Sequence, residues 1–380
     1  MINVRAIALY LPQFHPIPEN DTWWSPGFTE WTNTARARPM FRGHYQPHIP
    51  ADLGFYDLRL SETREAQAAM ARACGIEGFC YYHYWFAGRR ILERPFNEVL
   101  VSGAPDFPFC LCWANETWSG IWHGAPDRIL IEQTYPGPQD HEAHFRTLLP
   151  AFRDRRHIRV DGKPLFLIFK PEKLPDAQRS LAQWRAMAVA EGLGGLHIVG
   201  MSAYPEWTPG PSGFDAKMVA PLVLQRPWVS RRQPFKWLRR RIAEWRRLPT
   251  VHHYRTFVDL NMPVSIRDYE AYPCVIHTWD NTPRSGSNGV VLQGSTPEEY
   301  RRLLLGAARA LQDKPAQRRL LILKSWNEWA EGNHLEPDLL SGHAYLEVVR
   351  QVLTADQRPA DERTLLAAVS GGPRVVAGRP

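Results

Sequence analysis

Two glutamates stand three positions apart in the stretch LLILKSWNEWAEGNHLEPD, residues 320–338 of the 380-residue chain. They are Glu328 and Glu331. A glycosidic bond breaks through an oxocarbenium-like transition state, so its cleavage needs one acid to protonate the departing oxygen and a second carboxylate to act as base or nucleophile. Two glutamates at the end of one strand could supply both groups. A capping or surface pair in a first helical turn is the structural alternative.

The surroundings of the pair favour chemistry over capping. The run from Leu320 to Trp326 is mostly aliphatic and typical of a buried parallel strand, so both carboxylates come where such a strand ends. Trp326 and Trp329 would partly desolvate a carboxylate and raise its pKa, which makes it a usable acid near neutral pH. We therefore predict that Glu328 and Glu331 are catalytic.

The glutamates require a scaffold, and the chain supplies an alternation of strands and helices. Strand candidates are residues 4–11, 78–84, 107–113, 164–170, 196–202, 214–220, 274–279 and 319–326. Expected helices are 61–74, 139–154, 176–191, 297–312 and 343–354, with Ser61 and Thr296 at N-cap positions. Eight strands with helical crossovers predict an α/β fold of the (β/α)8 TIM-barrel class. Long βα loops at 12–60, 114–138 and about 221–272 would surround its mouth.

Length, composition and cysteine content set the expected domain organisation and location. We expect one barrel domain over residues 1–357, with an insertion at about 221–272, and a partly flexible tail over 358–380. The chain lacks an apolar run of 18 residues and a secretory signal pattern, which favours a cytoplasmic location. Five cysteines, mostly in apolar segments, fit reduced core thiols. Cys110 and Cys112 lack zinc-ligand spacing, and we expect no metal and no cofactor.

Polar and aromatic residues follow the C-terminal ends of six predicted strands, the edge where a barrel forms its active site. Tyrosine and tryptophan offer a sugar ring a flat apolar face and a polar tip. The expected substrate-binding residues are His15, Trp24, Glu30, Trp31, His44, Tyr82, His83, Trp113, Asn115, Glu116, Lys170, Tyr204, Trp279, Asp280, Asn327, Trp329 and His334. A structural role is an equal alternative for Trp24, Glu30, Trp31, Tyr82 and Trp113. Support of the catalytic loop is the alternative for His334, together with Glu336 and Asp338.

Several long motifs resemble a known family. They are AIALYLPQFHPIPEND at residues 6–21, HYQPHIPADLGFYDLR at 44–59, GFCYYHYWF at 78–86, CLCWANETW at 110–118 and WNEWAEGNHLEPD at 326–338. The chain resembles the WbsX-like glycosyltransferase family of bacterial polysaccharide gene clusters, also described as a glycoside hydrolase family 99-like domain. The resemblance covers about residues 3–355 and implies a (β/α)8 barrel and carbohydrate chemistry.

The resemblance also implies roles for the two glutamates. Family 99 hydrolases are retaining endo-α-mannanases and mannosidases, and their Glu-Trp-x-Glu element after strand eight is similar to residues 328–331. By this likeness Glu328 would deprotonate the sugar 2-hydroxyl, which attacks the anomeric carbon to give a 1,2-anhydro intermediate. Glu331 would act as general acid and then as base. Ala330 stands where those hydrolases carry a histidine.

Three functions stay open at this point. The first is metal-independent, retaining cleavage or transfer of an α-linked glycosyl unit in surface polysaccharide metabolism, such as that of O-antigen or capsule. The second is a glycosyltransferase that uses a nucleotide-linked or lipid-linked donor, although the chain has neither a G-x-G-x-x-G after its first strand nor a D-x-D triplet. The third is a non-catalytic glycan-binding barrel.

A basic segment suggests a partner. Residues 231–248 contain seven arginines and one lysine against one glutamate. As a helix, the segment would place Phe235, Leu238, Ile242 and Trp245 on one face and arginines on the other. Such a helix could bind the anionic inner membrane surface, where a lipid-linked glycan is found. Packing of the apolar face on the barrel is the alternative. We expect an oligosaccharide or polysaccharide substrate and no nucleic acid, because no recognition motif accompanies the basic patch.

Overall fold

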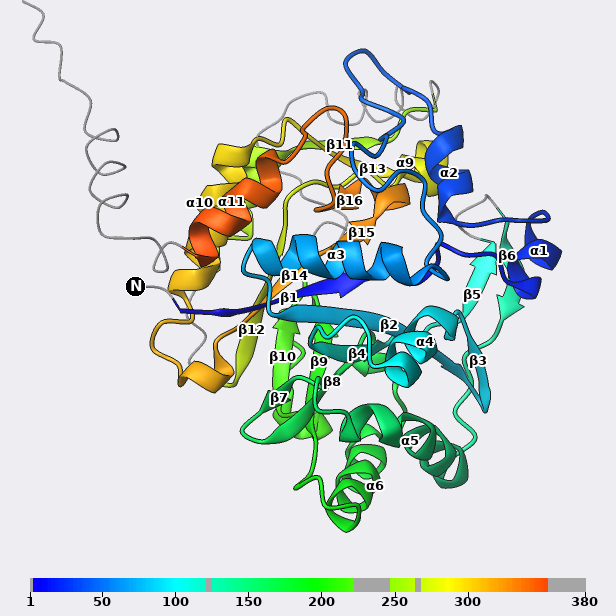
Figure 1. Cartoon of the computed structure of the whole chain (residues 1–380), viewed down its shortest axis with the longest axis vertical. Coiled ribbons are helices and arrows are strands. Elements are labelled where there is room, and N and C mark those ends of the chain that lie inside the picture. The colour runs from blue at the N-terminus through cyan, green and yellow to red at the C-terminus, as the bar shows by residue number, and fades with distance from the viewer. Residues whose placement is uncertain (1–2, 121–124, 222–246, 264–267, 355–380) are drawn as a thin grey trace, which may run out of the picture.

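Eight parallel strands close into a barrel in the computed structural model, which describes residues 3–120, 125–221, 247–263 and 268–354 (Figure 1). Around the barrel the strands are β1 (Arg5–Tyr10), β2 (Gly78–Phe86), β4 (Phe109–Trp113), β8 (Lys163–Ile168), β9 (His197–Ser202), β10 (Ala216–Val219), β12 (Ala271–Ile276) and β14 (Leu320–Lys324). Strand β1 closes the ring by pairing with both β14 and β2. The predicted TIM barrel and all eight of its strands are confirmed.

The strands form where the sequence offers short apolar runs. Every residue of β2, β4, β9, β12 and β14 is buried, because helices cover the outside of the barrel and side chains fill its interior. The longer helices are α3 (Ser61–Ala73), α4 (Arg94–Ser102), α5 (Pro138–Arg153), α6 (Ala177–Ala190), α8 (Tyr254–Leu260), α10 (Pro297–Arg309) and α11 (Ala344–Leu353). The five expected helices are confirmed, and Figure 1 shows α10 beside α11 and α5 beside α6.

The two predicted N-caps differ in outcome. The Thr296 side chain accepts a hydrogen bond from the Glu299 N–H at 3.3 Å, so the cap of α10 is as expected. The prediction for Ser61 was wrong. Leu60 occupies the cap position of α3, Ser61 is the first helical residue, and its hydroxyl bonds the Glu62 carboxylate instead.

Short elements occupy the loops. These are α1 (Pro18–Trp23), α2 (Glu30–Arg36), α9 (Thr282–Ser285), β3 (Arg89–Ile91), β5 (Trp118–Gly120), β6 (Ala125–Ile131), β7 (Arg159–Val160), β11 (Thr250–His253), β13 (Val290–Gln293), β15 (Asn327–Glu328) and β16 (Asn333–His334), with 3-10 turns at 171–173, 210–212, 286–288, 316–318 and 329–331. The turn at 329–331, called η7, contacts both α2 and α9 beyond the end of β14. Segments far apart in the chain thus meet at the glutamates.

The remaining expectations concern the cysteines, the tail, the basic segment and the insertion. All five cysteines are free and buried, which confirms core thiols. The expected tail and residues 231–246 of the basic segment lie outside the described residues. Within the described ranges, none of the helices has the length and apolar character needed to cross a membrane. The insertion at about 221–272 contributes β11 and α8 to the described part.

Candidate active site

A tight hairpin carries the two glutamates. Glu328 ends β15, η7 turns the chain, and Glu331 precedes Gly332 and β16. Gly332 has a φ of +53°, and a Cβ at this position would lie 2.9 Å from the Cβ of Asp280. Only glycine tolerates both the left-handed conformation and the close approach. The hairpin is therefore pressed against Asp280, whose N–H donates to the Glu331 carbonyl oxygen at 2.7 Å.

The hairpin is also tied to the first strand. The Asn327 side chain accepts the N–H of Leu11 at 2.8 Å and donates to its carbonyl oxygen at 3.0 Å. This amide is fully buried, so its fixed bonds set where the chain leaves β14. Asn327, predicted to bind substrate, joins the ends of β14 and β1 in this structure.

Five charged side chains form one chain of ion pairs at this end of the barrel. Lys324, at the end of β14, places its Nζ 3.0 Å from Glu328 and 3.6 Å from Glu331. Arg284 of α9 contacts Glu331 at 2.6 Å and Glu30 of α2 at 2.8 Å. The group holds three carboxyl groups and two cations. A proton on one carboxyl group would therefore balance its charge.

That proton belongs on Glu331. Burial raises the pKa of Glu331 to about 8, the charge of Glu328 adds to the shift, and Arg284 and Lys324 offset only part of it. Burial acts on Glu328 in the same direction, but the attraction of Lys324 and a hydrogen bond from Glu331 outweigh it and lower the pKa of Glu328 to about 2. Near neutral pH, a protonated Glu331 thus donates a hydrogen bond to an ionised Glu328. Carboxyl groups with separated pKa values are the pattern of an acid and a base.

Aromatic side chains surround the pair. Burial raises the pKa values of the Tyr82 and Tyr84 phenols, and the negative charge of Glu328 adds to both shifts. Both of these β2 side chains therefore lie near the Glu328 carboxylate. The Nζ of Lys324 lies 5.1 Å from the ring centre of Trp279, a cation–π contact. Tyr82, Trp279 and Glu30, three predicted site residues, are thus brought to the glutamates.

A second layer braces Glu331 through Asp280. The Asp280 Oδ2 accepts bonds at 2.6 Å from both His44 Nε2 and the Gln46 side-chain amide. Because the His44 Nδ1 accepts the Met40 N–H, the imidazole Nε2 carries the proton given to Asp280. Burial would raise the pKa of Asp280, but these hydrogen bonds and that from Thr282 hold it below its usual range. His44 therefore helps to fix Asp280, and Asp280 in turn holds the hairpin at Glu331.

Trp326 and Trp329, the tryptophans beside the two glutamates, are packed in the core. Trp329 donates its indole N–H to Glu336 at 2.7 Å, packs against Trp31 and stacks on His334 with ring centres 3.6 Å apart. The indole N–H of Trp31 donates to the Tyr56 carbonyl oxygen at 2.8 Å. Trp326 is fully buried against Phe79. Trp329 thus donates its indole N–H to Glu336 and to neither of the predicted catalytic glutamates. Trp31 packs against Trp329 in the same core region.

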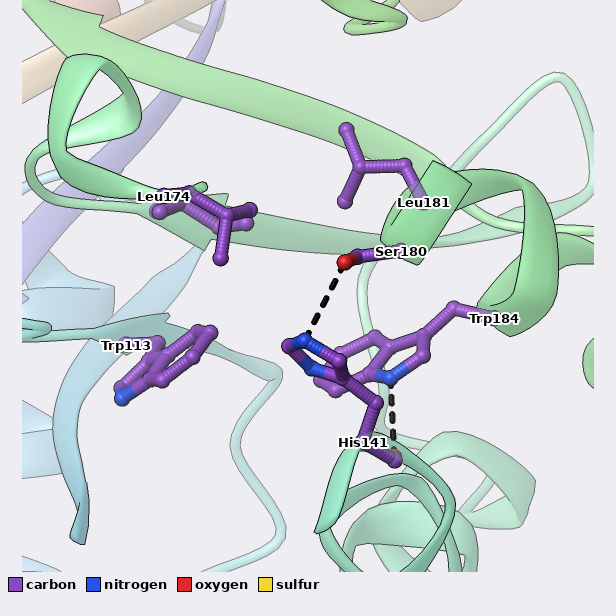
Figure 2. Close-up of a pocket in the computed structure, with 7 residues that line it drawn as sticks. Trp113, His141, Leu174, Ser180, Leu181 and Trp184 are labelled. Atoms are coloured by element: carbon purple, nitrogen blue, oxygen red, sulfur yellow. Dashed lines mark hydrogen bonds between the residues drawn. The ribbon is translucent and has the colours of Figure 1, made fainter. Parts of the chain in front are cut away.

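His83 and Trp113 point away from the site, contrary to the expectation that both face the mouth. They are paired in register on β2 and β4, and side chains alternate along a strand, so His83 faces away from its neighbours Tyr82 and Tyr84. His83 bonds His144 of α5 at 2.8 Å, between barrel and helix. Trp113 lines a cavity of about 10 Å³, and Figure 2 shows it facing His141, which is bonded to Ser180 and Trp184. This small space has a mostly apolar lining and is a packing gap.

The other predicted residues are dispersed. The Asn115 amide bonds both backbone groups of Lys170, and Lys170 places its ammonium group over Phe169. Glu116 forms a partly exposed pair with Lys173, and Tyr204 is exposed. His15 is buried with its Nδ1 bonded to the Pro12 carbonyl oxygen, and Trp24 packs near Phe28. None of these contacts involves the five charged side chains of the ion-pair chain that contains Glu331.

Two charged members of the site, Lys324 and Arg284, were missed, as were Tyr84 and Gln46. Lys324 had a signal, because a lysine inside the apolar run LLILKSW must find a carboxylate when that strand is buried. Arg284 had none: it lies in a polar loop, and only the fold brings it to Glu331. Among the described residues, a group with possible metal donors lies beside the β16 strand of this hairpin and comprises His48, His334 and Asp338.

Comparison with known proteins agrees with this architecture. The family model described as Glycosyltransferase WbsX matches residues 6–349. Two proteins named "Uncharacterized protein WxcX", from two strains of Xanthomonas campestris pv. campestris, are each 38% identical over 92% of this chain. The chain spans about half the length of these relatives, 49% of each.

Solved structures share the fold. The glycoside hydrolase family 99 endo-α-mannosidase from Bacteroides thetaiotaomicron, in complex with bis-tris propane, aligns with a TM-score of 0.57 and 12% identity, over 96% of this chain and all of that one. Another structure of a family 99 endo-α-mannosidase from this organism gives 0.55 and 14% identity, over 94% of this chain and 98% of that one. A glycoside hydrolase-like protein gives 0.55 and 14% identity, over 92% of this chain and 94% of that one.

Proposed function

We propose that this chain, which belongs to the WbsX glycosyltransferase family, cleaves or transfers an α-linked glycosyl unit with retention of configuration, in the metabolism of a bacterial surface polysaccharide. Family and fold both point to carbohydrate chemistry. The observation that carries the proposal is the buried pair of hydrogen-bonded carboxyl groups with opposite pKa shifts, Glu331 up to about 8 and Glu328 down to about 2.

Each carboxyl group is in the state that the reaction needs at neutral pH. In the first step Glu331 gives its proton to the departing glycosidic oxygen as the bond to the anomeric carbon breaks. Glu328 takes the proton of the 2-hydroxyl, whose oxygen bonds to the anomeric carbon. In the second step water or an acceptor hydroxyl gives its proton to Glu331 and attacks the anomeric carbon. The bond between this carbon and the 2-oxygen breaks, and Glu328 returns its proton to the 2-oxygen. Both glutamates end as they began.

Substrate must open the site. The Glu328 and Glu331 side chains are only 5% and 11% exposed, and Arg284 bridges Glu331 to Glu30. A sugar hydroxyl that bonds Glu331 therefore has to displace Arg284 or Glu328 from it. Lys324 stays between the glutamates and keeps Glu328 ionised, which suits a base.

The test uses Glu331→Gln and Glu328→Gln, with Glu347→Gln as a surface control. Each purified variant is incubated with α-linked oligosaccharides and α-glycosyl fluorides, with and without acceptor sugars. We expect wild type and the control to turn over at least one substrate with retention, and both active-site variants to lose about 100-fold or more in kcat. Turnover by Glu331→Gln at the wild-type rate would refute the assignment. A 2-deoxy substrate should be inert, because it lacks the hydroxyl that Glu328 deprotonates.

Transfer from an activated donor is the second candidate, favoured by the family's description as a glycosyltransferase. The same incubation with nucleotide sugars or a lipid-linked sugar plus acceptor separates the two. Product that requires the activated donor supports transfer, whereas product formed from an oligosaccharide without acceptor supports hydrolysis. Glycan binding retained in both glutamine variants, with no turnover by wild type of any substrate, would instead indicate a binding barrel.

The partner proposal is a lipid-linked glycan at the inner membrane surface, reached through residues 231–248. Vesicles with anionic lipids should sediment the wild-type protein, and replacing the arginines of this segment with glutamine should abolish sedimentation at low salt. Equal sedimentation of the two proteins would remove the membrane from the proposal.

A further inference from the structure

A second cluster of polar side chains lies where the first loop meets this hairpin, separate from the glutamates. His48 comes from the first loop, His334 from β16, and Asp338 from the segment after it. The His48 Nδ1 is 2.9 Å from the His334 Nε2, and the Asp338 Oδ2 is 3.5 Å from the first nitrogen and 3.7 Å from the second. Their side chains are 11%, 3% and 6% exposed. Three atoms that could each bind a metal ion thus lie close together and are shielded from solvent.

Other contacts orient two of the three donors, His334 and Asp338. The His334 Nδ1 faces the Glu336 carbonyl oxygen at 2.8 Å and donates to it, so the neutral ring presents the lone pair of Nε2 to the cluster. Stacking on Trp329 fixes the plane of this ring. The Asp338 Oδ1 accepts the N–H groups of Leu340 and Ser341 at 3.0 and 2.6 Å, which leaves Oδ2 for the histidines. Outer partners of this kind are what orient metal ligands in proteins.

The backbone holds the two loops together around the cluster. The Leu339 N–H donates to the Ile49 carbonyl oxygen and the Ala51 N–H to the Pro337 carbonyl oxygen, both at 2.9 Å. These bonds join the segment next to His48 to the segment around Asp338. The donor set is therefore largely formed before any ion binds, which lowers the cost of binding.

The spacing of the donor atoms fits a small divalent ion. Ligand atoms about 2.0–2.2 Å from zinc at tetrahedral angles lie roughly 3.3–3.6 Å apart. The three observed separations, 2.9, 3.5 and 3.7 Å, bracket this value. A cavity of about 10 Å³, roughly the space of one water molecule, adjoins the cluster and is lined by His334, Asp338 and His277 among others. It provides a place for a fourth, water ligand.

We propose that His48, His334 and Asp338 bind one divalent transition-metal ion, with zinc the best match to two imidazoles and a carboxylate. The ion clamps the first loop onto the hairpin that carries Glu328 and Glu331. It takes no part in the proton transfers described above. Its function is to hold the hairpin, so the site can be tested whether or not the proposed reaction is correct.

The experiment measures metal binding directly. Untagged full-length protein is stripped with a chelator, dialysed, and titrated with Zn²⁺ by calorimetry and with Co²⁺ by visible absorption. We expect one ion per chain, and a tetrahedral Co²⁺ spectrum without a thiolate charge-transfer band, because the five buried cysteines are not ligands. Zinc should also raise the melting temperature of the stripped wild-type protein.

His48→Ala and Asp338→Asn remove one ligand each, and His343→Ala is the matched control, an exposed histidine paired with Asp52 nearby. We expect the first two to bind zinc about 100-fold more weakly or worse, since loss of outer partners alone costs 10- to 100-fold, and the control to bind like wild type. His48 is the most exposed of the three ligands, so its loss should leave the fold intact. Wild type that binds no stoichiometric ion, or His48→Ala that binds as tightly, would overturn the proposal and leave a hydrogen-bonded trio.

Discussion

The buried contact between Lys324 and Glu328 can be tested by replacing Lys324 with methionine, which keeps an unbranched side chain one atom shorter and removes its charge. Lys324 provides the largest of the attractions that lower the Glu328 pKa from 4.5 to about 2. At about 1.4 kcal/mol per pKa unit, that shift corresponds to ~3 kcal/mol of stability at neutral pH. If the variant loses the whole shift, an unfolding entropy of about 2.1 cal/mol/K per residue gives a melting temperature lower by about 4 °C.

The pH dependence follows from the direction of the shift. Because the folded-state pKa of Glu328 is depressed, its stabilising contribution is present above the unfolded pKa of about 4.3 and is lost as the pH falls toward 2. The difference between wild type and Lys324→Met should therefore be largest near neutral pH and shrink in acid. Thermal melts followed by circular dichroism from about pH 2 to pH 7 would measure it, because this range covers the interval between the folded and unfolded pKa values.

Two further variants make the test selective. Lys324→Met combined with Glu328→Gln removes both charges and should recover part of the lost stability, because the single variant leaves an unpaired buried carboxylate. Lys173→Met, which breaks the partly exposed pair with Glu116, should change the melting temperature by no more than about 1 °C. If Lys324→Met melts like the Lys173 control, or if the double variant is no more stable than the single one, the electrostatic argument for the site is refuted.

Three other predictions concern separate features. With any glycan that is turned over, kcat/KM should fall about tenfold between pH 7 and pH 9, because Glu331 has a pKa of about 8 and must be protonated to act as an acid; a rate that rises over this range would contradict its role. Gly332→Ala should lower the melting temperature more than Gly342→Ala, since both have positive φ but only the first places a Cβ against Asp280; equal losses by calorimetry would show that the close approach is unimportant. The five buried cysteines should resist a thiol reagent in the native protein and all react in denaturant; fast reaction of native protein would disprove their burial.

Much of the barrel could be predicted because its signals are local. A run such as LLILKSW has to be buried, and apolar runs alternating with helical patterns leave few arrangements other than parallel strands with helical crossovers. Strand ends were therefore predictable, and with them the position of Glu328 and Glu331. The direction of a side chain at a strand end was harder to predict. His83 and Tyr84 are neighbours in the sequence, yet one faces α5 and the other faces the glutamates, because strand alternation and barrel closure decide the face.

The sequence by itself determined the barrel, the buried cysteines and the pair of acids after the last strand, because each rests on the pattern of adjacent residues. The tertiary structure alone decided which groups act on those acids. Arg284 and Glu30 are more than 250 positions apart and meet only because α2 and α9 pack over the end of β14. The same holds for His48 beside His334. Electrostatic shifts depend on distance and burial in three dimensions, and no spacing along the chain encodes either.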